Sequence, residues 1–151
     1  LLNLKPSLIM NNLALTDFPL LSFDKIRYAD TDRQGHVNNA VFSTFVETGR
    51  VEFLYNPETN ILSENASFVI AKLELQLLNE MTMPGRVDIG TGILRVGNSS
   101  ITIYQQLFQG EICTAIAKTV IVQTKDGKSY PLSDEAKTAL NKWVINLETK
   151  D

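Results

Sequence analysis

The chain has 151 residues, of which 44% are hydrophobic and 21% are charged, which is typical of one globular domain with a sizeable core. Its formal net charge of -3 argues against a nucleic-acid-binding protein, which needs a basic surface for phosphates. The single cysteine, Cys113, excludes an intramolecular disulfide, and with one histidine, His36, it also excludes a zinc site built from His and Cys ligands. We therefore expect a reducing, cytoplasmic location.

Residues 1–21 are rich in leucine, but Lys5, Pro6 and Asp17 interrupt the apolar run. No run in the chain approaches the roughly 18–20 apolar residues that span a bilayer, so we expect no membrane span. The segment also lacks a clean signal-peptide core and the arginines of a typical transit peptide. The sequence is therefore divided into an N-terminal extension of uncertain role, residues 1–21, and one domain, residues 22–151.

A strand is predicted over residues 23–28, which alternate between apolar and polar. The following residues, 29–38, are rich in Asp, Asn and Gly and are typical of a structured loop. A helix is predicted from Asn39 to Leu54, because its apolar residues fall on one stripe at helical spacing. Gly49 lowers the helix propensity by about 1 kcal/mol relative to Ala, which indicates that the helix approaches a sheet closely there.

The remaining sequence is mostly strand-like. Strands are predicted over residues 68–78, 86–96, 99–108 and 112–124, with tight turns at Gly97-Asn98 and Asp126-Gly127. Ser133 is a predicted N-cap for a short helix through about Ile145. The order of one strand, one long helix and four antiparallel strands predicts an α+β fold in which a curved sheet wraps around one central helix.

The stretch from Arg27 to Arg50 places a carboxylate-rich loop directly before the buried helix. Free N–H groups in the first helical turn, together with the helix dipole, can polarise a carbonyl oxygen. A carboxylate held a few residues upstream can attack that carbonyl or activate a water. This combination indicates acyl-transfer chemistry.

Residues 30–40 read Asp-Thr-Asp-x-x-Gly-His-Val-Asn-Asn-Ala, and this pattern resembles the 4-hydroxybenzoyl-CoA thioesterase family of the hotdog fold. Glu47 and Arg50 on the helix and the turn at residues 97–100 extend the resemblance, which covers about residues 22–140. The resemblance implies an acyl-CoA thioesterase that needs no metal or other cofactor. It also implies a homodimer or homotetramer whose sheets join edge to edge, with each active site at a subunit boundary.

The resemblance further implies that Asp32 is the catalytic carboxylate, acting as nucleophile or general base, and that the backbone N–H near Asn39 forms the oxyanion site. His36 is a candidate for orienting the aspartate or a water. Glu47 is a second candidate nucleophile, because another branch of hotdog thioesterases uses a helix glutamate at this spacing from the helix start. Substrate contacts are expected from residues in the loop, the helix cap and the later turn: Tyr28, Gly35, Asn38, Ser99 and Ser100. In related Tol–Pal-associated thioesterases a tyrosine likewise precedes the catalytic aspartate by four residues, but a histidine occupies the position of Asn39.

Structural roles compete with these assignments. Asp30 and Asp32 could tie down the loop by accepting backbone hydrogen bonds. Glu47 and Arg50 lie three residues apart and could form an ion pair on the helix surface, and the two adjacent asparagines could serve only as helix caps. Cys113 lies in a strand-like run without a nearby histidine, which favours core packing.

Three alternative functions remain open at this point. A hotdog dehydratase or hydratase uses a histidine with a helix acid, often in a His-Phe-Pro context, which this sequence lacks. A plant-type acyl-carrier-protein thioesterase takes a histidine from a later strand, and the later half of this chain has no histidine. A non-catalytic acyl-binding module is disfavoured by the intact Asp32.

Overall fold

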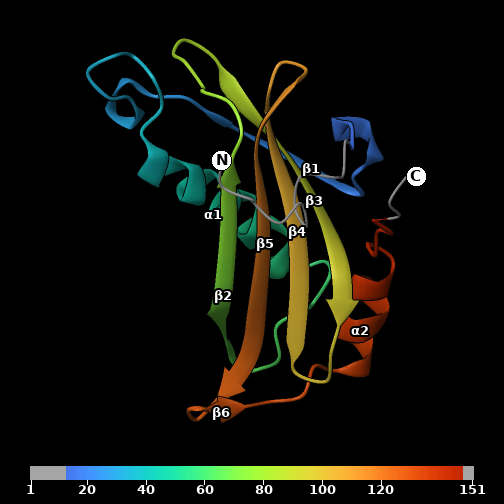
Figure 1. Ribbon diagram of the computed structural model, residues 1–151. Coiled ribbons are helices and arrows are strands. Elements are labelled where there is room, and N and C mark those ends of the chain that lie inside the picture. The colour runs from blue at the N-terminus through green and yellow to red at the C-terminus, as the bar shows by residue number, and fades with distance from the viewer. Residues whose placement is uncertain (1–12, 148–151) are drawn as a thin grey trace, which may run out of the picture.

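The computed structural model describes residues 13–147 and forms one curved antiparallel sheet with a long helix against one face (Figure 1). The strands are β1 (Leu20–Lys25), β2 (Ser67–Leu77), β3 (Arg86–Val96), β4 (Ser100–Gln109), β5 (Ile112–Lys125) and β6 (Lys128–Ser129). The helices are α1 (Asn39–Leu54) and α2 (Asp134–Asn141), with 3-10 turns η1 (Leu15–Asp17) and η2 (Tyr28–Asp30). The α+β class and the curved sheet around one long helix, as in the hotdog fold, are confirmed.

The strands follow the order β1-β3-β4-β5-β2, all antiparallel, with the short β6 paired to β5. The four later strands and α1 lie within one residue of their predicted bounds. The predicted strand over residues 23–28 is wrong in position, because β1 pairs with β3 from Leu20↔Thr91 to Lys25↔Arg86. Helix α2 ends four residues before the predicted Ile145, and the chain after it makes a parallel bridge from Val144 to Ile93.

Helix α1 covers what we call the inner face of the sheet. Phe42, Phe45 and Val46 are buried there in the core. Gly49 sits where helix and sheet are closest, since an added Cβ would lie 2.6 Å from Gln105 Nε2 and 2.7 Å from a methyl group of Ile89. The predicted close approach is confirmed, and the Gln105 amide uses it to donate a hydrogen bond to the Val46 carbonyl (3.0 Å).

The opposite, outer face is packed by the segment that precedes β1. Phe18 is buried against Tyr104 and Phe108, with its ring stacked on the Tyr104 ring at 6.1 Å between centroids. Residues 13–21 of the expected extension therefore pack with the domain that we expected to begin at residue 22, whereas residues 1–12 lie outside the described residues. Within residues 13–147, no helix is long and apolar enough to cross a membrane.

Candidate functional site

The loop between β1 and α1 is anchored by Asp30. This carboxylate is buried and accepts hydrogen bonds from the Arg27 backbone N–H (2.8 Å) and from the Arg27 guanidinium (3.1 and 3.3 Å). The Asp30 carbonyl accepts the Asn38 N–H at 2.8 Å. These contacts close η2 and hold both ends of the loop, so Asp30 has a structural role.

Asp32 is exposed and lies two residues further along this loop. Its Oδ1 accepts the backbone N–H groups of Gln34 (2.8 Å) and His36 (3.2 Å), and its own N–H donates to the His36 carbonyl (2.8 Å). The Asp32 side chain therefore stabilises the loop by accepting backbone hydrogen bonds, which is the structural role that the sequence offered as an alternative. Oδ2 makes no hydrogen bond to residues 13–147, so this oxygen is available for chemistry.

At the start of α1 the first N–H groups have different environments. The Asn38 side chain caps the helix by accepting the Ala40 N–H at 3.0 Å, and the Asn38 carbonyl accepts the Val41 N–H at 2.9 Å. The Asn39 N–H makes no hydrogen bond to the described part of the chain. It is therefore a donor at the positive end of the helix dipole that can bind a negatively polarised oxygen.

One pocket of about 380 Å³ brings these groups together. Asp32, His36 and Asn39 line it from the loop and the helix start. Its opposite wall is the end of β2 and the chain that follows it, residues 77–80. His36 Nε2 lies 3.3 Å from Glu80 Oε2, and the Val37 N–H donates to the Met81 carbonyl at 2.8 Å, so the loop is fastened to this wall.

The residues of this wall, Leu77, Leu78, Asn79 and Glu80, were not among the predicted site residues. They lie far from the motif in sequence, and nothing in their pattern marks them as part of a site. The only available signal is their position at the end of a strand and directly after it, where a connection can reach a neighbouring loop.

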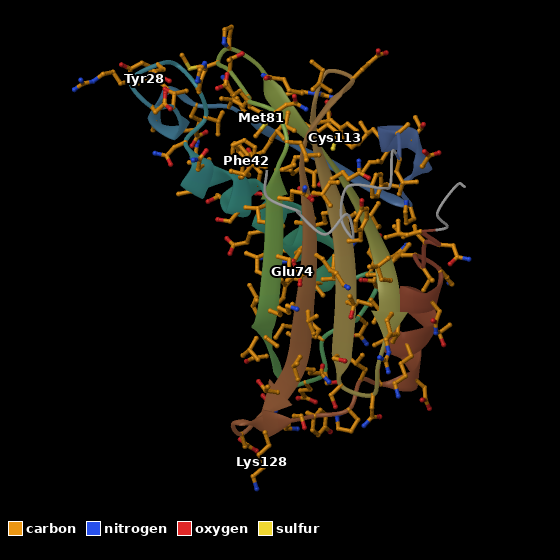
Figure 2. All side chains as sticks on the ribbon, in the orientation of Figure 1. Tyr28, Phe42, Glu74, Met81, Cys113 and Lys128 are labelled. Atoms are coloured by element: carbon orange, nitrogen blue, oxygen red, sulfur yellow. The ribbon has the colours of Figure 1, made fainter. Side chains whose placement is uncertain are left out.

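The other loop residues have distinct placements. Tyr28 is 82% exposed and projects away from the sheet (Figure 2), and it does not line the pocket. Gly35 has φ +80°, a left-handed conformation that favours glycine and turns the chain between Asp32 and His36. Asn38 acts as the helix cap described above. The substrate contacts expected of these three residues stay predictions.

Glu47 and the two serines lie outside the pocket. Glu47 is exposed, two turns into α1. Ser99 and Ser100 lie at the β3–β4 turn, at the opposite end of the sheet from the loop before α1 (Figure 1). Ser100 is seven residues along β4 from Leu107, which is level with Leu77 through Ala115, a separation of roughly 23 Å at about 3.3 Å per residue. Their contact with CoA also stays a prediction.

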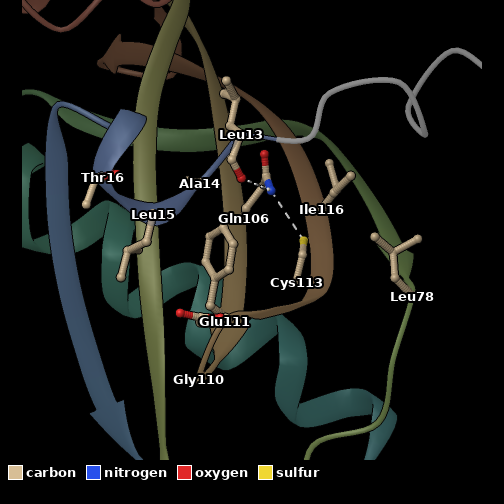
Figure 3. Close-up of a pocket in the computed structure, with 11 residues that line it drawn as sticks. Leu13, Ala14, Leu15, Thr16, Leu78, Gln106, Gly110, Glu111, Cys113 and Ile116 are labelled. Atoms are coloured by element: carbon tan, nitrogen blue, oxygen red, sulfur yellow. Dashed lines mark hydrogen bonds between the residues drawn. The ribbon is translucent and has the colours of Figure 1, made fainter.

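A larger hollow of about 690 Å³ lies on the outer face, beside Leu13 and the β4–β5 turn (Figure 3). Gln106 Nε2 donates to the Leu13 carbonyl (3.3 Å) and to Cys113 Sγ (3.3 Å) in its wall. Burial raises the pKa of the Cys113 thiol, which disfavours the nucleophilic thiolate. Neither Asp32 nor the start of α1 lines this hollow, so the smaller pocket is the one that contains the predicted catalytic residues.

The described residues hold no cluster of three His, Cys, Asp or Glu side chains suited to a metal ion. The pocket at the start of α1 thus offers one carboxylate, one imidazole paired with a glutamate, and one open backbone donor. A carbonyl group bound there would have a nucleophile or base on one side and an N–H for its oxygen on the other.

Known proteins resemble this chain in sequence and in fold. The family model of the thioesterase-like superfamily matches residues 26–140. The uncharacterized protein YsmA of Bacillus subtilis is 28% identical over 130 residues, which cover 83% of this chain and 87% of that protein. The structure of a predicted thioesterase from Bacillus stearothermophilus is 29% identical with a TM-score of 0.74, covering 83% of this chain and 96% of that one. A Thermus thermophilus thioesterase, solved in complex with coenzyme A and Zn, is 25% identical with a TM-score of 0.73, covering 84% and 95%.

Proposed function

The chain belongs to the thioesterase-like superfamily, and from this premise we propose that it hydrolyses acyl-CoA thioesters to a free acid and CoA. The observation that carries the proposal is the pocket shared by Asp32 and the open Asn39 N–H. Hydrolysis of a thioester needs a nucleophile at the carbonyl carbon and a donor for the carbonyl oxygen, and these two groups supply both.

In the proposed reaction the thioester oxygen accepts a hydrogen bond from the Asn39 N–H. Asp32 either attacks the carbonyl carbon, giving a mixed anhydride that water then opens, or it takes a proton from a water that attacks directly. In both routes the bond between carbonyl carbon and sulfur breaks, and CoA leaves as the thiolate, which then takes up a proton. The acid and CoA are the products either way.

CoA as the carrier is supported by the Thermus relative, whose structure holds coenzyme A. A thiol-release assay over acyl-CoAs of different chain length and ring content, with acyl-carrier-protein thioesters alongside, tests the carrier and the acyl group together. We expect hydrolysis of at least one acyl-CoA and slower release from the carrier protein. Binding of acyl-CoA without any thiol release would instead indicate a non-catalytic acyl-binding module. The cytoplasmic location stays part of the proposal.

We also propose that the active form is a homodimer joined along β2. In residues 13–147 this strand of 11 residues pairs only with β5 and forms an edge of the sheet. Its inner-face side chains are unusually accessible, with Ile70, Leu73 and Leu77 exposed by 51%, 39% and 43%. A long apolar edge of this kind is normally paired or covered in a native protein.

The exposed inner-face side chains of Ile70, Leu73 and Leu77 form what we call the β2 strip. Helix α1 does not cover this strip, because it packs mainly over β1, β3 and β4. A second copy that adds its own β2 antiparallel to this one would continue the sheet and bring its helix over the exposed strip. The second copy would also form one wall of the candidate pocket, because the pocket extends to this edge of the sheet at Leu77 and Leu78. Light scattering tests the dimer, with an expected mass of twice the 16.9 kDa of one chain.

A further inference from the structure

Arg50 is a buried charge to which residues 13–147 offer no close counter-charge. Its side chain lies on the buried stripe of α1 and is only 5% exposed. Its hydrogen bond is a long one, from Nη1 to Thr119 Oγ1 at 3.5 Å. Within residues 13–147, no carboxylate oxygen lies within 4.0 Å of it. Burial lowers the pKa of this guanidinium, and a buried charge is costly unless it is paired.

The position of Arg50 points to the uncovered edge of the sheet. Its partner Thr119 lies on the inner face of β5, directly beside Leu73 of the edge strand β2. Arg50 therefore occupies the flank of α1 that faces β5 and β2, where the proposed dimer would place a second helix. This inference rests on that part of the proposed function.

We infer that Arg50 pairs with Glu47 of a second copy across the dimer axis. Glu47 is exposed and lies three residues before Arg50, so the two side chains are about 60° apart around the same flank of α1. Nearby, Glu47 is the carboxylate that favours the charged form of Arg50, yet the two do not form a contact ion pair within one chain. In a two-fold symmetric interface each copy supplies one Arg50 and one Glu47, so the same pair forms twice.

In this pairing Glu47 and Arg50 stabilise the dimer. This role differs from the two that the sequence suggested, an ion pair on the surface of one helix and a catalytic glutamate. Each Arg50 gains a counter-charge only when the second copy is in place, so burial of the guanidinium is tied to assembly. A mispaired or shifted dimer would leave two buried cations unpaired, which favours one register of the two β2 strands.

The first experiment compares two charge reversals on α1 by measuring the dimer dissociation constant with analytical ultracentrifugation. In a Glu47→Arg dimer the new arginine of each copy would face Arg50 of the other copy. Because like charges repel, we expect the dissociation constant to rise at least about tenfold. Glu52→Arg is the matched control, since Glu52 is also exposed on α1 but lies on the opposite flank, in a hollow beside Leu20 and Leu21 of β1. We expect this control to dimerise like the wild type.

The second experiment separates pairing between chains from pairing within one helix. A Glu47→Arg chain carries two cations at these positions, and an Arg50→Glu chain carries two carboxylates. Mixed one to one, they restore both cross-dimer pairs while each helix keeps like charges. We expect native mass spectrometry to show mainly the mixed dimer, whereas an intrahelical pair would give no preference for it.

Circular dichroism checks that Arg50→Glu folds, and the comparison of Glu47→Arg with Glu52→Arg does not depend on that variant. If the wild type is a dimer and Glu47→Arg has the same dissociation constant, the pairing is wrong but the proposed dimer stands. A monomeric wild type would overturn both the pairing and the proposed dimer. Thioester hydrolysis by the wild type is measured separately, so its failure bears on the proposed activity and not on the pairing.

Discussion

Two neighbouring N–H groups at the start of α1 differ in one respect that bears on catalysis. The Ala40 N–H is held by the Asn38 cap, while the Asn39 N–H has no partner in the described chain. Proline is well tolerated at the first position of a helix, and Asn38 already has the extended backbone (φ -60°, ψ 137°) that a following proline requires. Asn39→Pro therefore removes this single donor without breaking the helix.

We expect Asn39→Pro to lower kcat by about 100- to 1,000-fold, the usual loss for one oxyanion donor. Asn39→Ala, which keeps the N–H, is the matched control and should cost less than about tenfold. Steady-state kinetics and a thermal melt of both variants make the comparison. If Asn39→Ala is the more damaging change, the Asn39 side chain carries the effect and the backbone assignment is wrong.

The sequence motif placed Asp32 and Asn39 near one another because only six residues separate them, and both line the pocket. It could not show which N–H of the first turn is open, because this depends on the rotamer of Asn38. It could not show Glu80 either, since the contact with His36 arises only when the chain after β2 folds back onto the loop. Local spacing predicts local geometry, but contacts between distant segments need the fold.

At the level of elements, the junction of α1 with the sheet depends on Gly49. Alanine has a higher helix propensity than glycine by about 1 kcal/mol. Its methyl group would, however, overlap Gln105 Nε2 and Ile89, and overpacking of this kind costs about 1 to 3 kcal/mol. We expect Gly49→Ala to lower the free energy of unfolding, read as a lower urea midpoint. A higher midpoint would show that helix and sheet can move apart at no cost.

The elements were predicted unequally well. Helix α1 was predicted to its last residue, because a polar cap and a single apolar stripe define it. The hairpin strands β3 and β4 were predicted from the Gly97-Asn98 turn. Strand β1 was misplaced, because the alternation after Phe23 continues to Tyr28 while the pairing with β3 ends at Lys25. Hydrogen bonds between distant strands decided that boundary.

At the level of the whole molecule, the exposed β2 strip predicts a dimer. A charged side chain introduced into this strip should prevent the dimer from forming. Ile70 faces the inner side, opposite Ile121, and is 51% exposed. Ile70→Lys would bury an unpaired cation in the proposed interface, so we expect a chain of 16.9 kDa in light scattering at micromolar concentration.

Val69→Lys is the matched control for this test. Val69 is similarly exposed, at 47%, but as the neighbouring residue of the strand it points to the outer face. We expect it to remain dimeric. Equal behaviour of the two variants would argue against an interface on the inner face of β2.

The proposed role of Asp32 in acyl-CoA hydrolysis is tested most directly by measuring thiol release with the Asp32→Asn variant. An asparagine Oδ1 can still accept the N–H groups of Gln34 and His36, so the loop should keep its shape while the carboxylate is lost. We expect kcat to fall at least about 100-fold with an unchanged circular dichroism spectrum, and Glu47→Gln to retain near-normal kcat when it is assayed at a protein concentration at which it is dimeric. Near-normal turnover by Asp32→Asn, with Glu47→Gln inactive, would contradict the account and assign the chemistry to the helix glutamate.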